Sequence, residues 1–147
     1  AAWNMISGTI VPWAAVEHPD GFALAQTWID ARDENVVVSG WKTLGALAIT
    51  VPDDQLPVKP FSSLLDRVSK TLRASPDDVR SAMNGFIIAV GTYVAPLGDK
   101  AIATARKVGR VEVDVGDTEC KVPDAEAYIM KCRRGAPIAP KRKTVRC

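Results

Sequence analysis

Histidine and cysteine are scarce in this chain. Among 147 residues there are one histidine, His18, and three cysteines, Cys120, Cys132 and Cys147. An odd number of cysteines at these spacings fits neither a disulfide framework nor the paired Cys-x-x-Cys units of a zinc site. We therefore expect reduced thiols and no bound metal. The phosphate-binding loop and the glycine-rich dinucleotide turn are also missing, so no nucleotide cofactor is expected.

Long apolar runs are absent as well. No stretch of about eighteen uncharged apolar residues could span a bilayer, and the first residues do not resemble a secretory signal. These absences predict a cytoplasmic protein that does not contact membranes. The chain starts at Ala1 without a methionine and enters an apolar segment at once, so we expect it to be the later part of a longer protein.

Acidic residues are missing from the C-terminal end. Residues 131–147 carry seven basic side chains and no acidic one, whereas the preceding 130 residues carry twelve basic and seventeen acidic ones. Charge separated in this way is typical of a segment that meets a polyanion, and nucleic acid is the first candidate. The candidate DNA contacts are Arg133, Arg134, Lys141, Arg142, Lys143 and Arg146. The alternative is a solvated, frayed terminus.

Helical periodicity dominates the rest of the chain. Apolar residues recur at helical spacing in segments that begin near residues 19, 34, 60, 76, 96 and 123. Only residues 111–115 alternate as an extended segment would. The fold class is therefore all-α, either a closed bundle or a stack of helical pairs. We divide the chain into a helical domain over residues 1–135 and a basic tail over residues 136–147.

The helix that begins near residue 76 has two unusual features. Ser75 precedes Pro76 and two aspartates, which predicts a serine N-cap. Gly85 and Gly91 lie inside the helix, where each costs up to about 1 kcal/mol relative to alanine. Such glycines indicate the close approach of another helix or of a ligand, and helix packing is the more common reason.

Several segments together resemble the bacterial DNA alkylation repair family. They are the run Val111 to Pro123, the residues Ala125, Ala127, Tyr128, Ile129 and Lys131, the closing Lys141 to Cys147, and upstream Met83-Asn84 and Leu64 to Arg67. The similarity extends over the whole chain, which would match the later two-thirds of a family member. The resemblance implies a superhelix of HEAT-like repeats, stacked antiparallel helix pairs that hold double-stranded DNA in a basic concavity. It also implies an alkylpurine DNA glycosylase that excises cationic N3- or N7-alkylated bases without flipping them.

The catalytic pattern of that family is incomplete here. In the active glycosylases a tryptophan that contacts the sugar of the lesion precedes by four positions an aspartate that stabilises the sugar cation. The matching residues in this sequence are Trp3 and Ser7, so the carboxylate is missing. Asn4 replaces a neighbouring acid, no second tryptophan lies near residues 84–86, and no phosphate-gripping arginine lies within residues 35–41.

The missing carboxylate decides what the resemblance can imply. A fixed negative charge beside a developing cation lowers the barrier by several kcal/mol, and a serine hydroxyl does not supply it, although it could orient a water. We therefore expect Trp3 and Ser7 to lie at the catalytic position of a HEAT-like-repeat protein that binds DNA, alkylated or not, through its basic residues, with base excision doubtful. The alternative is a non-enzymatic helical-repeat scaffold that binds a protein partner, with Trp3 as a core or interface aromatic.

Overall fold

The computed structural model describes residues 5–114 and 122–145, and this part of the chain is helical without strands. The elements are η1 (Ile6–Ile10, a π-helical turn), α2 (Val11–Glu17), α3 (Gly21–Trp28), α4 (Glu34–Thr50), α5 (Val58–Thr71), η2 (Leu72–Ala74), α6 (Asp77–Tyr93), η3 (Ala95–Leu97), α7 (Gly98–Val108) and α8 (Ala125–Arg133). The prediction of an all-α fold is confirmed.

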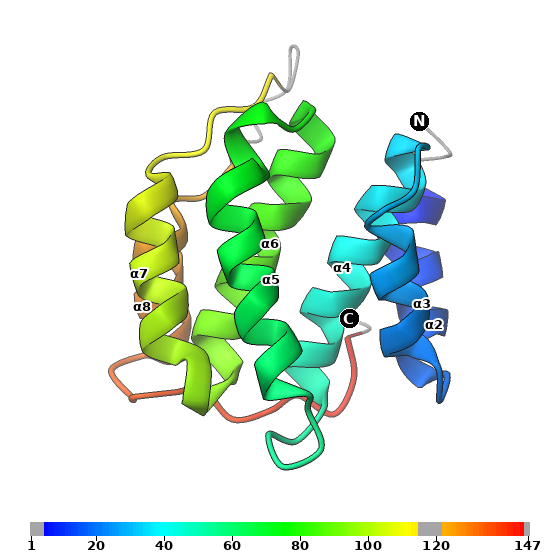
Figure 1. Cartoon of the computed structure of the whole chain (residues 1–147). Coiled ribbons are helices and arrows are strands. Elements are labelled where there is room, and N and C mark those ends of the chain that lie inside the picture. Colours follow the sequence, from blue (N-terminus) through cyan, green and yellow to red (C-terminus); the bar gives the residue numbers. More distant parts are fainter. Residues whose placement is uncertain (1–4, 115–121, 146–147) are drawn as a thin grey trace.

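The helices form two layers. In Figure 1, α3, α5 and α7 lie in front of α2, α4, α6 and α8. Within the rear layer α4 packs closely against α6 and also contacts η1 and α2, while α6 contacts α8. Helices α3 and α7 pack on α4 and α6 respectively, and α5 contacts α7. The arrangement is a stack of helical pairs, which leaves the outer face of the rear layer open to a large ligand.

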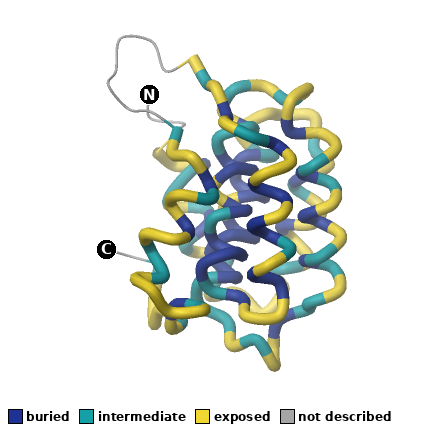
Figure 2. The backbone as a smooth tube through the Cα atoms, turned by 90° about the vertical axis from the view of Figure 1, so that its left-hand side faces the viewer, coloured by how far each residue is buried: buried dark blue, intermediate teal, exposed yellow. Residues whose placement is uncertain are grey.

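Aromatic rings join the two layers. Phe22 of α3 stacks on Phe61 of α5 at 5.7 Å between ring centroids, and Phe61 lies 5.7 Å from Phe86 of α6. Phe86 in turn lies 5.3 Å from Trp41 of α4. The last three rings are essentially fully buried. The buried stretches of backbone lie on the faces where helices meet (Figure 2). Aromatic pairs at such contacts stabilise the fold by more than the area that they bury.

Two local predictions differ from the structure. The predicted helix start at Pro19 is wrong by two residues, because residues 18–20 form a turn in which the Gly21 amide donates to the His18 carbonyl at 3.0 Å. Ser75 is not the N-cap of α6: Pro76 holds that position without a side-chain hydrogen bond. The Ser75 hydroxyl instead donates to the Thr71 carbonyl at 2.9 Å, because the preceding helix ends immediately before it.

The two glycines of α6 have different surroundings. A Cβ at Gly91 would come within 2.5 Å of Cδ1 of Ile129 and 3.2 Å of Cβ of Ala101. The prediction of close helix approach is therefore confirmed for Gly91, where α7 and α8 meet α6. A Cβ at Gly85 would meet no atom within 4 Å, so helix packing does not explain that glycine.

The start of the basic tail is fixed to the helical body. The Ala139 amide donates to the Thr92 carbonyl at 2.8 Å, and the Arg142 amide donates to the Ile49 carbonyl at 3.0 Å. The Lys141 ammonium lies 2.8 Å from a carboxylate oxygen of Asp53. This segment runs along one end of the stack, below α6 and α4 in Figure 1. A frayed terminus is therefore wrong for residues 139–142.

Candidate nucleic-acid interface

A groove lies over α4 on the outer face of the rear layer, between η1 and α2 on one side and α6 on the other. Its volume is about 250 Å³. The groove is lined by Gly8, Pro12 and Trp13 from η1 and α2, by Trp41, Lys42, Gly45, Ala46 and Ile49 from α4, by Ser81, Ala82, Gly85, Phe86 and Ala89 from α6, and by Val145 from the tail. We call it the α4 groove. Because Val145 borders it, the basic tail passes one end of the α4 groove.

Lys42 is the charged residue that lines the α4 groove. Its ammonium sits over Gly8, where a Cβ would come within 2.8 Å of the lysine Nζ. Burial of part of the side chain lowers the pKa of Lys42, while the nearby Asp78 carboxylate opposes that shift. Within the described ranges Lys42 forms no hydrogen bond or ion pair, whereas Lys100, for example, lies 2.8 Å from the carboxylate of Asp66. A cation on a concave surface attracts anions, and the Asp78 carboxylate offsets part of the charge of Lys42.

Trp13 and Gly85 border the same space. Trp13 of α2 is half-buried and Gly85 of α6 is exposed. A glycine inside a helix costs roughly 1 kcal/mol relative to alanine, and nothing within 4 Å of Gly85 requires the absence of a side chain. The α4 groove therefore combines an aromatic surface, a cation and a stretch of bare helix backbone.

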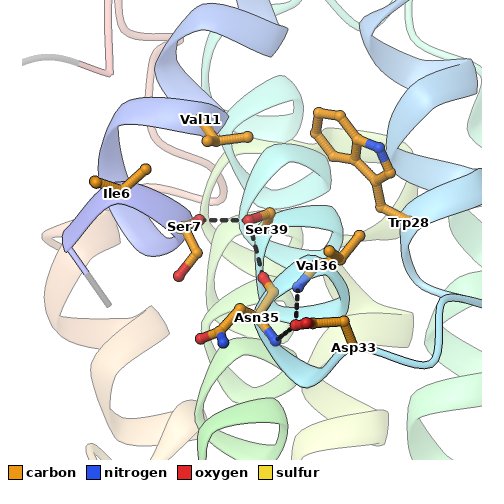
Figure 3. A pocket seen from close by; sticks show the side chains of 8 residues that line it. All are labelled: Ile6, Ser7, Val11, Trp28, Asp33, Asn35, Val36 and Ser39. Carbon is orange, nitrogen blue, oxygen red and sulfur yellow. Dashed lines mark hydrogen bonds between the residues drawn. The ribbon is translucent and has the colours of Figure 1, made fainter. Parts of the chain in front are cut away.

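Ser7 lies beside a second, larger cavity at the beginning of α4. This cavity has a volume of about 470 Å³ and is lined by Ile6, Ser7, Val11, Trp28, Asp33, Asn35, Val36 and Ser39. Figure 3 shows Trp28 on one side and Ile6 and Val11 on the other. The Ser39 hydroxyl lies 2.7 Å from the Ser7 carbonyl oxygen and 3.0 Å from that of Asn35. Ser7 is buried, with 7% of its surface exposed. Because its carbonyl accepts the hydrogen bond from Ser39, the backbone of Ser7 joins η1 to α4.

The carboxylate in this larger cavity stabilises the start of α4. Asp33 accepts a hydrogen bond from the Asn35 amide at 2.8 Å and one from the Val36 amide at 3.4 Å (Figure 3). This is the N-cap geometry that satisfies exposed amides of the first turn. Trp3 and Asn4 lie outside the described residues, so the pairing of Trp3 with Ser7 stays a prediction.

A third cavity, beside Ser7, contains charges of both signs. A small cavity of about 110 Å³ borders Ser7 and is also lined by Val38, Lys42, Asp78 and Ser81. A carboxylate and an ammonium thus share this space. Such a pair does not provide the uncompensated negative charge that would stabilise a sugar cation.

Comparisons with known proteins agree with the geometry of the stack. No family model matches the chain. A solved structure described as "a new family of proteins related to the HEAT-like repeat DNA glycosylases with affinity for branched DNA structures" is similar over 97% of this chain and 61% of its own, with a TM-score of 0.88 and 31% sequence identity. This chain has a HEAT-like helical-repeat fold.

Two uncharacterized proteins are also similar to this HEAT-like chain. Lmo0209 of Listeria monocytogenes and Lin0241 of Listeria innocua are each 37% identical to it over 114 residues. The match covers 78% of this chain and 48% of each Listeria protein. The chain therefore spans about half the length of the curated relatives it matches.

The six residues predicted to contact DNA differ in their surroundings within the HEAT-like fold. Arg133 is half-buried and its Nε donates to the Gly91 carbonyl at 2.9 Å, and Lys141 pairs with Asp53, so both contribute to the fold. Arg134, Arg142 and Lys143 are exposed, and Arg146 lies outside the described residues. The structure brings the tail beside the α4 groove but leaves Arg134 at the end of α8. DNA contact by these residues stays a prediction.

Two lining residues of the α4 groove, Lys42 and Trp13, were not predicted from the sequence, and for Gly85 helix packing was favoured over the approach of a ligand. Lys42 is the sole charged residue between Glu34 and Asp53, and a lone charge in an otherwise apolar helix was the available signal. Gly85 was noticed, but its spacing alone favoured helix packing. Trp13 had no such signal, because the segment that became η1 and α2 was not predicted to be helical.

Residues 5–114 and 122–145 contain no single helix that is both long and apolar enough to cross a membrane, although the pair Asp77–Tyr93 and Ala95–Val108, bent by 116°, is long and apolar enough together. The same residues contain no group of three or more His, Cys, Asp or Glu that could hold a metal ion. Cys132 is a free, half-buried thiol, and Cys120 and Cys147 lie outside the described residues.

Proposed function

We propose that this chain binds DNA, with branched DNA as its preferred form, and that it does not excise bases. The observation that carries the proposal is the α4 groove, in which Lys42 has no hydrogen-bond or ion-pair partner in the described part of the chain and which the basic tail borders at Val145. The exposed Arg142 and Lys143 lie three and two residues before Val145 in that tail. The proposal is supported by the similar solved structure, whose family is described as having affinity for branched DNA structures.

The binding is expected to be mainly electrostatic. Lysine and arginine side chains that contact phosphates release counterions, so affinity falls steeply with salt and depends little on base sequence. Arg142 and Lys143 follow a fixed backbone segment, because the Arg142 amide is hydrogen-bonded to α4. A branch point presents phosphates from more than one duplex arm. A groove with cations at its end can therefore contact two arms together.

Base excision is the second candidate, because the similar family is described as related to DNA glycosylases. Two features argue against it in this chain. Ser7 carries no charge, and the two carboxylates that line cavities beside it have other roles: Asp78 shares its cavity with Lys42, and Asp33 accepts hydrogen bonds from amides at the start of α4. If excision nevertheless occurs, incubation with duplex DNA that contains N7-methylguanine should release free base above the spontaneous rate. We expect no release above that rate.

Salt and tail variants test the binding proposal. We expect a fluorescently labelled four-way junction to bind more tightly than a duplex of the same sequence, with affinity that falls steeply from low to physiological salt. Replacement of Arg142 and Lys143 by alanine should weaken binding and reduce the salt slope by about two. The matched control replaces Lys59 and Lys70, two exposed residues of α5 that line no part of the α4 groove. Equal effects of the two double variants would contradict the proposed interface and favour a nonspecific charge effect.

A protein partner is the remaining alternative. A scaffold of this kind would not distinguish a junction from a duplex. Indifference of the wild-type chain to both DNA form and salt would therefore overturn DNA binding and leave the scaffold function.

A further inference from the structure

We propose that the α4 groove accommodates one unpaired nucleotide at the branch point of the DNA. Its base stacks on Trp13, its phosphate lies at Lys42, and one edge of the base faces the backbone of α6 at Gly85. This inference rests on the proposed DNA binding and extends it. The groove then binds the unpaired nucleotide, and the basic tail binds phosphates of the duplex arms.

Gly85 provides the first step. It lies in the middle of α6, where a glycine lowers helix stability, and it is exposed toward the α4 groove. The other interior glycine of α6, Gly91, is required by contact with Ile129, whereas Gly85 meets no atom within 4 Å. A ligand that approaches the helix backbone closely gives a physical reason for a glycine at this position.

Lys42 provides the second step. The other lining residues of the α4 groove are uncharged, and the ammonium has no hydrogen-bond or ion-pair partner in the described part of the chain. Gly8 keeps space for the ammonium, because a methyl group there would come within 2.8 Å of Nζ. A phosphate at this position would pair with a cation that is already partly desolvated, which strengthens the attraction.

Trp13 and the size of the groove provide the third step. An aromatic ring offers a stacking surface to any base, and such stacking is largely independent of sequence. The volume of about 250 Å³ corresponds to roughly eight water molecules in the liquid, which suits a single planar base and is far too small for a duplex. Bases at a branch point are the ones most readily freed from stacking, so the groove selects a feature that a continuous duplex lacks.

The test compares two three-way junctions of the same sequence, one fully paired and one with a single unpaired nucleotide at the branch. For the wild-type chain we expect tighter binding of the second junction by about fivefold to 150-fold, the range for one stacked base. A third junction, in which the unpaired nucleotide is abasic, should lose most of that gain, because the sugar and phosphate remain but the base that would stack is missing.

Four variants at two positions and one control variant test whether the gain comes from the groove. Trp13→Ala should bring the ratio of the two affinities close to one, and Trp13→Phe should retain part of it. Gly85→Leu should also abolish the gain, because its side chain would occupy the groove, while Gly85→Ala keeps the fold and should reduce the gain in part. Trp28→Ala is the control, since Trp28 lines the other cavity, and it should leave the ratio unchanged.

The outcomes separate this inference from the proposed function. A wild-type ratio near one, or a ratio unchanged in Trp13→Ala and Gly85→Ala, overturns the inference and leaves junction binding intact. Loss of binding to every junction overturns the proposed function as well. A larger change in Trp28→Ala than in Trp13→Ala would place the nucleotide in the cavity beside Ser7 and would also overturn the inference.

Discussion

Lys42 shows how one side chain can set the chemistry of a groove. Its ammonium lies over Gly8, next to Ser7, the residue that the sequence resemblance predicts at the position of a catalytic carboxylate. Lys42 and Asp78 are the charged residues that line the adjoining small cavity. A cation attracts phosphate and repels a developing sugar cation. The electrostatics at this position therefore favour DNA binding without excision.

Replacement of Lys42 by glutamine tests that role. We expect weaker junction binding and a decrease of about one in the slope of log affinity against log salt, because one phosphate contact is lost. Lys59→Gln, which removes an exposed lysine on α5, should leave both values close to those of the wild type. A full salt titration by fluorescence anisotropy measures the two slopes, and an unchanged slope in Lys42→Gln would exclude a phosphate at this lysine.

Asp66 and Lys100 form an ion pair whose contribution depends on pH. The hydrogen bond from Lys100 lowers the pKa of Asp66 below its ordinary value of 3.8. A carboxyl group with a lower pKa in the folded state stabilises that state above pH 3.8, and the contribution is lost as pH falls through the folded pKa. Because the Asp66 side chain is exposed and that of Lys100 is partly exposed, the effect should be small.

Urea unfolding of Asp66→Asn at a series of pH values measures this contribution. We expect the variant to be slightly less stable than the wild type near pH 7, and the difference to vanish in strong acid. Asp54→Asn, at an exposed position without an ion pair in the described residues, serves as the control. A stability difference that persists unchanged below the folded pKa would rule out the ion pair as its origin.

At the scale of the helix, α6 contains two glycines with opposite expected effects. Gly85→Ala should raise the free energy of unfolding by up to about 1 kcal/mol, because it removes the glycine penalty and meets open space. Gly91→Ala should lower it, because a methyl group would come within 2.5 Å of Ile129 and force the packed helices apart. Thermal and urea unfolding of both variants measure the two signs, and stabilisation by Gly91→Ala would contradict the packing of α8 on α6.

Sequence periodicity located most helices but not every one. Helices α4 to α8 carry apolar stripes and recognisable starts, so their positions could be predicted. The segment from Ile6 to Glu17 contains Gly8, Thr9 and Pro12, which are weak helix formers, and it becomes helical because it packs against α4. The two glycines of α6 had identical sequence signals, and only the positions of neighbouring helices distinguish them.

At the scale of the whole molecule, the tail is both a candidate DNA contact and a strap across the stack. Lys141 contacts Asp53 and also donates to the Ala48 carbonyl at 2.8 Å. Charge composition could predict a basic tail, but it could not distinguish Lys141, which stabilises the fold, from the exposed Lys143. That distinction depends on where residues far away in sequence lie in the folded chain.

Lys141→Ala should therefore lower stability, by about 1 kcal/mol for a charged hydrogen bond that is partly exposed. The backbone amides of residues 139–142 should exchange hydrogen faster in this variant, because the strap loses its anchor. Lys143→Ala should leave stability and exchange unchanged. Equal exchange in the two variants would show that the Lys141 contact does not hold the tail.

The most direct measurement of DNA binding is a competition on the wild-type chain at physiological salt. A labelled four-way junction is bound to the chain, and unlabelled junction or unlabelled duplex of the same sequence is added in increasing amounts. A junction-binding HEAT-like protein should release the labelled DNA at a much lower concentration of junction than of duplex. Equal competition by the two DNA forms, or no binding of the labelled junction, would contradict the proposed function.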